Sequence, residues 1–316
     1  MSKHKKRLIG DTSANLRTSI MKVIRNDWQL YLLILPAVVY VFIFHYIPMY
    51  GVQIAFKDFS TRLGIWNSPW VGFKHFIRFV TYPNFKKIIW NTLSITLYNL
   101  MTYPIPIILA LLINELNNQR FRKVVQMVSY APHFVSTVVV CSMLILFTDN
   151  NNGLFNHIIR ALGGTGSDWL SKPSLFPSLY VWSSVWQSAG WSTIIFLAAL
   201  AGVSPELYEA AYMDGASRLQ IILHVNIPAL APTIITMFIM RVGQIMSLGF
   251  EKIYLLQNSL NLDASQVIST YVYEMGVRNG QFSYASAIDL FNTVINILLL
   301  LVVNKISQRS AGVGIW

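Results

Sequence analysis

Six long apolar runs constrain the fold of this chain more than any other feature. Each run has at least 18 residues, and they occupy 30–47, 88–113, 124–147, 179–201, 229–250 and 285–303. An α-helix of about 20 apolar residues crosses the roughly 30 Å of hydrocarbon in a bilayer. None of the runs alternates apolar and polar residues with the period of two that membrane barrel strands show. The sequence therefore predicts an all-α polytopic membrane protein with six transmembrane helices.

The charge content agrees with this fold class. Apolar residues make up 54% of the 316 residues and charged residues only 12%, whereas soluble domains carry about 25% charged residues. The formal net charge of +11 comes from basic residues that bracket the spans. We therefore expect anionic lipid headgroups, rather than nucleic acid, as their counterparts. The single cysteine, Cys141, excludes a disulfide within the chain.

A basic leader before the first span indicates the orientation in the membrane. Basic residues gather on the cytoplasmic flanks of spans, and here they outweigh Asp11 and Asp27: Lys3, Lys5, Lys6, Arg7, Arg17, Lys22 and Arg25. Because six spans return the chain to the same side, both termini are expected in the cytoplasm. The first outer loop weakens this bias, since it also carries basic residues: Lys57, Arg62, Lys74, Arg78, Lys86 and Lys87.

The expected organisation follows from the spans. We predict a cytoplasmic basic segment at 1–29, a six-helix transmembrane domain at 30–303 and a cytoplasmic tail at 304–316. No small-residue cleavage pattern follows the first span, so it is expected to be a retained helix of a multi-pass cell-membrane protein rather than a signal peptide.

One polar stretch, between the fourth and fifth spans, has the sequence of a helix. Ser204 suits the N-cap and Pro205 the first helical position, while Glu206 and Glu209 lie near the positive end of the helix dipole. Gly215 is the type of residue that ends a helix in the left-handed conformation. A short helix is therefore expected after Ser204.

A second short helix is expected directly after the first. Ser217 can cap it, and it would run toward Asn226, with Pro228 and Pro232 marking the entry into the next span. The loop, at 202–228, would then hold two helices at an angle. Small side chains leave its surface open to close approach by a partner: Ala210, Ala211 and Ala216.

Prolines also interrupt two of the other runs. Pro104 and Pro106 are expected to kink or end the helix of the second span, and Pro132 lies inside the third. His133, beside Pro132, is expected to be hydrogen-bonded within the bundle rather than to bind a ligand.

Polar side chains inside the last two spans indicate an interior face. An arginine in the hydrocarbon is costly unless it faces the bundle, water or a counter-ion, and Arg241 lies near the middle of the fifth span, three residues before Gln244. The sixth span carries Asp289, Asn292 and Asn296, which the helical period places on one face. Asp289 is the expected counter-ion of Arg241.

Aromatic residues open the fourth span. Trp182 and Trp186 share one helical face, next to Gln187, and the span also holds Trp191. Such a face can stack on a sugar ring, but a belt of tryptophans at the membrane interface explains these residues equally well.

No catalytic motif accompanies these features. The sequence has no phosphate loop of the G-x-x-x-x-G-K-S/T type, no Gly-x-Ser-x-Gly elbow and no histidine pair at a metal-binding spacing. We therefore expect a non-catalytic protein that binds no metal and no cofactor of its own.

The polar stretch carries a resemblance to a known family. The sequence Glu209-Ala210-Ala211, followed by Gly215, Ile227-Pro228 and Pro232, resembles the cytoplasmic loop signature of permease subunits of binding-protein-dependent ABC importers. Segments near the N-terminus resemble the carbohydrate branch, in particular the permeases for complex oligosaccharides of the polysaccharide, aldouronate and alginate type: 31–36, 45–51, 56–58 and 72–76.

This resemblance implies a function and partners. It implies a type I importer fold in which the loop is a coupling helix that seats in an ATPase subunit, through Glu206, Glu209, Ala210, Ala211, Asp214, Gly215 and Pro228. It further implies a second homologous permease, two ATPase subunits that hold ATP and Mg, and an extracytoplasmic sugar-binding protein.

The substrate contacts are not encoded in a motif, so their prediction depends on position. The expected pathway residues are Trp182, Trp186, Gln187, Arg241, Gln244, Asp289 and Asn292; packing or an interfacial position is the competing interpretation of each. Arg241 would favour an acidic, uronate-containing oligosaccharide. The alternatives are a proton-coupled secondary transporter that uses Asp289 and Arg241, which leaves the polar stretch unexplained, and an intramembrane enzyme, for which no nucleophile and base are recognisable.

Overall fold

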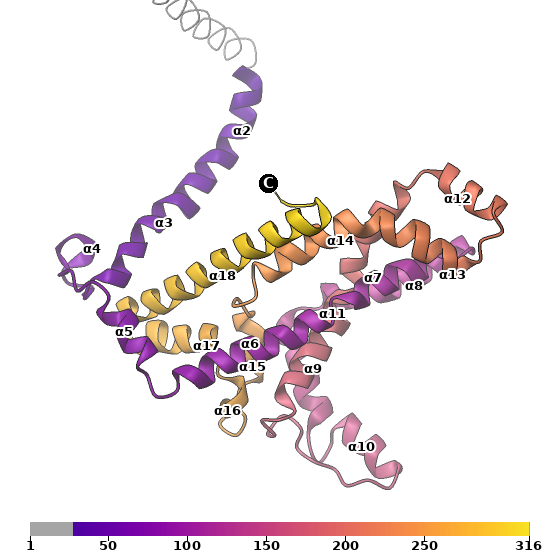
Figure 1. Cartoon of the computed structure of the whole chain (residues 1–316). Coiled ribbons are helices and arrows are strands. Elements are labelled where there is room, and N and C mark those ends of the chain that lie inside the picture. The colour runs from indigo at the N-terminus through magenta and orange to yellow at the C-terminus, as the bar shows by residue number, and fades with distance from the viewer. Residues whose placement is uncertain (1–27, 316) are drawn as a thin grey trace, which may run out of the picture. The chain divides into compact units, whose positions relative to one another are not determined.

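Helices form the regular structure of this protein (Figure 1). The computed structural model describes residues 28–315, so nearly all of the predicted segment at 1–29 lies outside the described residues. Within 28–315 the extended pairing is limited to one isolated antiparallel bridge, between Lys57 and Trp70. The contacts divide the described residues into two units, one at 28–54 with 59–69 and the other at 55–58 with 70–315.

The first unit contains one long apolar helix. It runs through α2 (Trp28–Val41), the π-turn η1 (Phe42–Tyr46), α3 (Ile47–Met49) and the start of η2 (Tyr50–Phe56), and no side chain of α2, η1 or α3 is buried. A helix with apolar side chains on every face is stable in lipid. In water the same side chains would be exposed unfavourably. The short helix α4 (Gly64–Asn67) follows, and Trp66 packs on Tyr50 with ring centroids 5.1 Å apart.

The second unit is a helical bundle. Its long helices are α6 (Phe85–Met101), α7 (Pro104–Asn114), α8 (Gln119–Tyr130), α9 (Thr137–Thr148), α11 (Phe176–Ala201), α14 (Ile227–Val242) and α18 (Phe282–Ala311). Shorter elements connect them: α5 (Lys74–Val80), η3 (Ala131–Phe134), α10 (Leu154–Ala161), α12 (Pro205–Met213), α13 (Arg218–Ile221), η4 (Ile222–Asn226), α15 (Phe250–Leu256), α16 (Leu262–Ser265), α17 (Ile268–Tyr273) and η5 (Glu274–Arg278).

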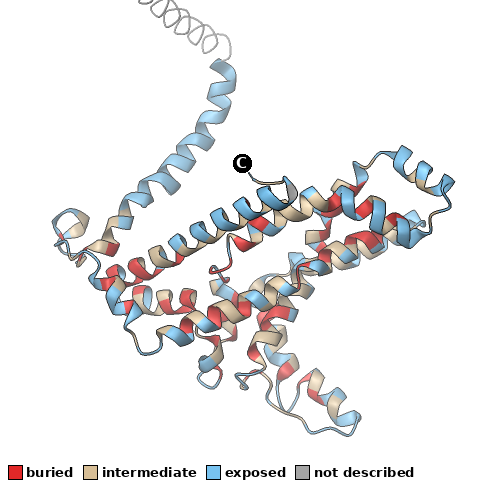
Figure 2. Cartoon of the chain, in the orientation of Figure 1, coloured by how far each residue is buried: buried red, intermediate tan, exposed pale blue. Residues whose placement is uncertain are grey.

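Three apolar clusters hold this bundle together. One centres on Phe176, a second on Phe79 and Tyr284, and a third on Phe196 and Leu230. The buried residues run along the facing sides of the long helices, whereas α12 is coloured as exposed (Figure 2). The bundle therefore buries its interior and leaves α12 outside it.

The number of spans is five or six in the described residues. Five helices are long and apolar enough to cross a membrane: Trp28–Phe56, Phe85–Asn114, Phe176–Ala201, Arg218–Val242 and Phe282–Ser310. The predicted third span, at 124–147, is not one straight helix, because Gln119–Phe134 and Thr137–Thr148 meet at a bend of 95°. Six crossings result if this bent pair counts as one span.

The bend has a local cause. Pro132 lies in the 3₁₀ turn η3, and Val135 and Ser136 after it are extended. The hydroxyl of Ser136 then caps α9 by accepting from the amide of Val139 at 3.4 Å. A proline and a new N-cap in succession end one helix and begin another in a different direction.

The second span behaves as its prolines predict. α6 ends at Met101 and α7 begins at Pro104, where a proline needs no intrahelical hydrogen bond. The hydroxyl of Thr102 donates to the carbonyl of Asn99 at 2.7 Å, which satisfies one of the carbonyls that the break leaves free.

The fifth span begins earlier than predicted. The helix expected to stop near Asn226 continues, so that α13, η4 and α14 form one helix from Arg218 to Val242. The wide π-turn η4 precedes Pro228, and it moves the backbone carbonyl that the proline ring would otherwise meet. Pro228 therefore reshapes this helix without ending it.

Candidate functional site

The polar stretch between α11 and α14 forms the helix that its sequence predicts. α12 begins with Pro205 at its first position and follows Ser204 at the N-cap position, although the side chain of Ser204 makes no capping hydrogen bond. Gly215 ends α12 with a positive φ of 72°. Its amide donates to the carbonyl of Tyr212, and the amide of Ala216 donates to that of Ala211 at 2.9 Å, which is the Schellman arrangement of a helix end.

A capping box begins the next helix. The amide of Ser217 donates to the side chain of Gln220 at 2.7 Å, and the amide of Gln220 donates back to the hydroxyl of Ser217 at 3.4 Å. The two reciprocal bonds satisfy amides that a helix start leaves free. The predicted turn between two short helices is therefore fixed by local hydrogen bonds.

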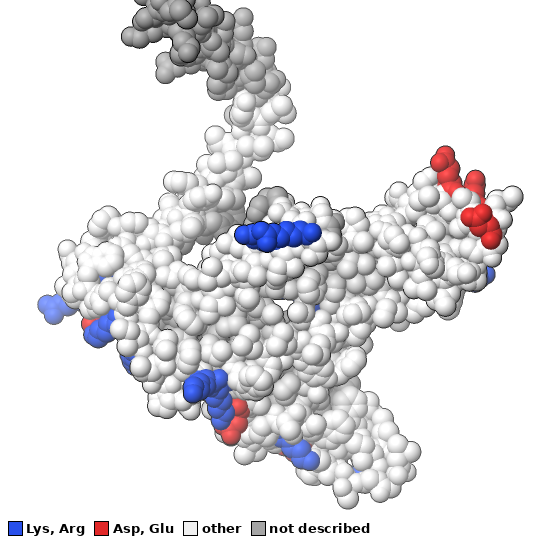
Figure 3. All heavy atoms as spheres, in the orientation of Figure 1, with Lys and Arg blue, Asp and Glu red and all other residues white. Residues whose placement is uncertain are grey.

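The surface of α12 is acidic and largely free of contacts. No residue of the helix is buried, and only Tyr208 and Ala211 are half-buried. Acidic side chains gather at this end of the molecule (Figure 3), and those in the loop are exposed: Glu206, Glu209 and Asp214. Among the residues of the predicted docking set, Ala210, Gly215 and Pro228 are also exposed. A projecting amphipathic helix of this kind is suited to bind a partner.

Tyr208 attaches this helix to the bundle. Its hydroxyl donates to the side-chain carbonyl of Asn226, at the end of η4, at 2.6 Å. Burial, together with the nearby carboxylate of Glu115, raises the pKa of Tyr208 above its usual value. The phenol therefore stays a hydrogen-bond donor at physiological pH.

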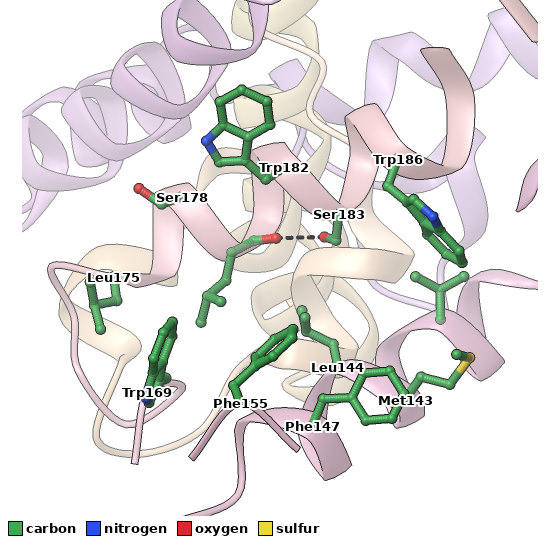
Figure 4. A pocket seen from close by; sticks show the side chains of 12 residues that line it. Met143, Leu144, Phe147, Phe155, Trp169, Leu175, Ser178, Trp182, Ser183 and Trp186 are labelled. Atoms are coloured by element: carbon green, nitrogen blue, oxygen red, sulfur yellow. Dashed lines mark hydrogen bonds between the residues drawn. The ribbon is translucent and has the colours of Figure 1, made fainter. Parts of the chain in front are cut away.

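An apolar cavity of about 570 Å³ lies between α9, α10 and α11. Trp182 and Trp186 of α11 line it, and Phe155 of α10 and Trp169 of the loop before α11 point toward the same space (Figure 4). The indole of Trp182 donates to the hydroxyl of Tyr98 at 2.9 Å. Two of the predicted pathway residues thus meet in one aromatic cavity.

Gln187 does not line this cavity. Its amide donates to the carbonyl of Val135 at 2.9 Å, across the bend between α8 and α9. Its contact in this structure is therefore with the bent span. The nearby ring of His133 stacks on Trp191, with centroids 4.6 Å apart and an interplanar angle of 5°. The side chain of His133 makes no hydrogen bond to the described residues, so the predicted hydrogen bond is wrong.

Arg241 has a different partner from the predicted one. It donates to the backbone carbonyl and to the side chain of Asn99, both at 2.9 Å, and its guanidinium lies 5.6 Å from the ring of Tyr103. Within residues 28–315 it makes no ion pair with Asp289. The break between α6 and α7 supplies the partner instead, because α6 ends there with free carbonyls.

Arg241 borders two cavities. One, of about 560 Å³, is also lined by Tyr103, Trp191 and Met237. The other, of about 170 Å³, is also lined by Asn99 and Gln244, together with Thr96, Tyr180 and Ser247. The guanidinium of Arg241 therefore borders both the wider and the narrower cavity. Gln244 lines only the narrower of these two.

The predicted polar stripe on α18 does not act as one surface. Asp289 is exposed, Asn292 is buried with its side-chain carbonyl unpartnered in the described part of the chain, and Asn296 bonds to the amide of Met246 and the hydroxyl of Ser247. Asn296 therefore fixes the turn that follows α14 against α18.

Lys252 is a buried cation that sequence reasoning missed. Only 7% of the residue is exposed, its ammonium donates to the hydroxyl of Ser184 at 2.9 Å, and it lies 5.6 Å from the ring of Tyr180. Burial lowers the pKa of Lys252 to about 8. Its position in a polar and aromatic segment between two spans gave no sign of burial.

Comparison with known proteins identifies the family of this structure. Residues 102–310 match the family described as "Binding-protein-dependent transport system inner membrane component". Two Bacillus subtilis (strain 168) proteins are 42% identical: the polygalacturonan/rhamnogalacturonan transport system permease protein YteP, over 94% of this chain and 92% of that protein, and protein LplB, over 99% and 98%.

A solved structure agrees with these relatives. A chain of the bacterial alginate ABC transporter, crystallised in complex with alginate pentasaccharide-bound periplasmic protein, superposes with a TM-score of 0.85 at 36% identity over 93% of this chain and 99% of that one. The chain therefore belongs to the family of inner membrane components of binding-protein-dependent transport systems, and it is a membrane permease rather than an enzyme.

Proposed function

We propose that this chain is the permease subunit of an ATP-driven importer that passes a uronate-containing oligosaccharide from an extracytoplasmic binding protein into the cytoplasm. The names of its relatives support the substrate class, since they refer to polygalacturonan, rhamnogalacturonan and alginate. The first two contain uronate sugars, and alginate is described as an acidic polysaccharide. A second permease, two ATPase subunits and a sugar-binding protein complete the proposed assembly.

The exposed acidic helix α12 is the observation that carries this proposal. α12 is short and buries no side chain, so packing against its own chain stabilises it little. Its role is therefore expected to be the binding of a partner. The proposed docking residues are Glu206, Glu209, Ala210, Ala211, Asp214, Gly215 and Pro228. The partner is the ATPase, which would hold ATP and Mg, whereas this chain would bind no cofactor.

The proposed orientation places this loop in the cytoplasm. The loop lies between the fourth and fifth crossings if the bent pair α8 and α9 counts as one. An even number of crossings separates it from the basic leader, which favours the cytoplasmic side. Both termini would then be cytoplasmic.

The two groups of cavity residues have different proposed roles. Trp182 and Trp186 would stack on sugar rings in the aromatic cavity, because sugar faces are apolar enough to pack on indole rings. Arg241 and Gln244 would bind polar groups, with the guanidinium favouring a carboxylate. Three further residues are proposed for the pathway but line neither the aromatic cavity nor the narrower cavity beside Arg241: Gln187, Asp289 and Asn292.

Co-purification tests the docking proposal. Glu209→Lys reverses an exposed charge on α12, and Gly215→Asp adds a side chain where φ is +72°; both should lose the ATPase subunit that wild type retains, while membrane insertion is unchanged. Glu251→Lys, at an exposed residue of α15, is the matched control. Equal ATPase recovery in all four proteins would refute docking through α12.

Uptake tests the substrate proposal. Arg241→Gln keeps a hydrogen-bond donor and removes the charge, so it should reduce uptake of a uronate oligosaccharide about tenfold relative to a neutral one, because one charge-assisted bond is worth about 1.5–3 kcal/mol. An unchanged ratio of the two uptake rates would remove Arg241 from substrate selection. The alternative, proton-coupled transport, predicts uptake that survives loss of the ATPase.

A further inference from the structure

The hydrogen bond between Tyr208 and Asn226 joins the exposed helix α12 to the start of the fifth span. The two atoms are 2.6 Å apart, and they belong to residues 18 positions apart in the sequence. Asn114 and Glu115, at the end of α7, lie beside the same hydroxyl and influence its acidity. Tyr208 is therefore the side chain of α12 on which three elements converge.

Asn226 is built as an anchor. It is completely buried, and its amide nitrogen has no hydrogen-bond partner within the described residues. Tyr208 is thus the partner of this side chain in the structure. Breaking the bond would leave the buried side-chain carbonyl of Asn226 without a partner, and the fold would lose the full desolvation energy of that group. The bond should therefore persist when α12 moves.

The position of Asn226 in the helix connects it to the substrate cavities. It is the last residue of the π-turn η4, directly before Ile227 and Pro228. From there α14 extends roughly 20 Å at about 1.5 Å per residue to Arg241, which borders both cavities. π-turns occur often at functional sites of helices, and a helix beyond such a turn can change direction as a unit.

The far part of α14 is held by other contacts. The hydroxyl of Tyr103 donates to the carbonyl of Ile234 at 2.6 Å, and Arg241 donates to Asn99. Both partners lie at or near the break between α6 and α7. A displacement at Asn226 therefore acts on a helix that is attached at its other end beside the cavities.

We propose that the Tyr208–Asn226 hydrogen bond is the positioning contact through which α12 transmits its movement to α14. Tyr208 and Asn226 are positioning residues, since neither lines the cavities beside Trp182 and Arg241. The inference rests on the proposed function of α12 as the helix that docks the ATPase. It adds the route by which that docking reaches the cavity wall.

Tyr208→Phe tests this route, because it removes only the hydroxyl. The matched control is Tyr212→Phe, four residues along the same helix, where the side chain is 63% exposed. The complete complex would be purified through this chain and reconstituted in liposomes with its binding protein. Uptake of a radiolabelled oligogalacturonate would be measured together with ATP hydrolysis.

The expected result is a loss of coupling. Tyr208→Phe should retain the ATPase subunit and its hydrolysis, but sugar imported per ATP should fall about five- to tenfold, as expected for the loss of one buried hydrogen bond. Tyr212→Phe should match wild type. Equal values for the two variants would overturn the proposal.

A second readout separates transmission from docking. If Tyr208→Phe loses the ATPase in proportion to uptake, the bond shapes the docking surface and the transmission proposal is wrong. If the wild-type chain itself retains no ATPase, the proposed function fails, and the inference fails with it. If the wild-type chain retains the ATPase and Tyr208→Phe stays fully coupled, only the inference fails.

Discussion

In the part of the chain that the structure describes, two π-turns precede the dipeptide Ile-Pro, and they differ in what surrounds them. η1 (Phe42–Tyr46) precedes Pro48, and η4 (Ile222–Asn226) precedes Pro228. In each, the amide of the isoleucine bonds to the carbonyl of the first turn residue, five positions earlier: Ile47 to Phe42 and Ile227 to Ile222. The two turns therefore share this hydrogen bond before Ile-Pro, although their own residues differ.

Their environments are opposite. Within its own unit every residue of η1 is exposed, whereas the last residue of η4, Asn226, is buried and bonded to Tyr208. A tertiary partner, which η4 has in Tyr208, therefore distinguishes two turns that share one backbone hydrogen-bond pattern. Four predictions compare residues that have tertiary partners with residues that are exposed. The first concerns Lys252, which is buried by tertiary packing.

Lys252 should give the largest effect. Its pKa in the folded chain is about 8, below the value of 10.5 for an unperturbed lysine, so the folded state binds fewer protons between these two values. Stability should therefore rise with pH from about 8 to 10.5, by at most about 3 kcal/mol. Thermal unfolding of the purified chain across this range should show the rise.

Lys252→Met should flatten that dependence, because it removes the titrating group. Lys305→Met, at an exposed residue near the end of α18, should leave the dependence as in wild type. If both variants keep the rise in melting temperature, burial of Lys252 is not its cause.

Replacing the last residue of each π-turn should give the next largest effect. Asn226→Leu removes the acceptor of Tyr208 and should lower sugar uptake about tenfold, since a lost buried hydrogen bond is worth about 1–2 kcal/mol. Tyr46→Leu, at an exposed residue of η1, should change uptake less than about twofold. Similar losses in the two variants would contradict the distinction between the turns.

Replacing the two prolines should have a smaller effect. Pro228→Ala restores an amide and removes the ring clash, so the helix can relax toward regular α geometry and rotate Asn226 away from Tyr208. We expect uptake to fall about threefold, a smaller free-energy change than loss of the whole bond. Hydrogen exchange at 222–226 should report the change in the turn, and Pro48→Ala should leave uptake unaltered.

An exposed ion pair should have the smallest effect. Lys74 donates to Asp58 at 2.6 Å, and this bond holds the pKa of Asp58 below its usual value. The pair stabilises the fold above the ordinary carboxyl pKa, and this contribution is lost as the pH falls through the lowered value. Asp58→Asn should reduce stability by less than about 1 kcal/mol at pH 7, as measured by thermal unfolding, and Asp168→Asn is the exposed control.

The local sequence was sufficient to predict α12 and its ends. Gly215 takes the positive φ, and Ser217 takes part in the capping box, because both depend on residues at most five positions away. The break before Pro104 was predictable for the same reason. The capping bond of Ser204 is the exception, since its side chain makes none.

Longer-range features were not predictable in this way. Arg241 was expected to pair with Asp289, but the end of α6 provides acceptors in Asn99, and no pattern in one sequence indicates which helix will be adjacent. The 95° bend after Pro132 also exceeds what a proline alone implies. The extended residues and the new N-cap after the proline produce it, and a residue from another helix, Gln187, then bonds to Val135 across the bend.

By itself the sequence determined most of the membrane-spanning helices, the family and both ends of α12, because hydropathy, motif spacing and capping act over a few neighbouring residues. Only the tertiary structure decided that Tyr208 bonds to Asn226, that Arg241 bonds to Asn99 and that Lys252 is buried. Those contacts join residues up to 142 positions apart, and they form only when helix packing brings the partners into the same place and excludes water from around them.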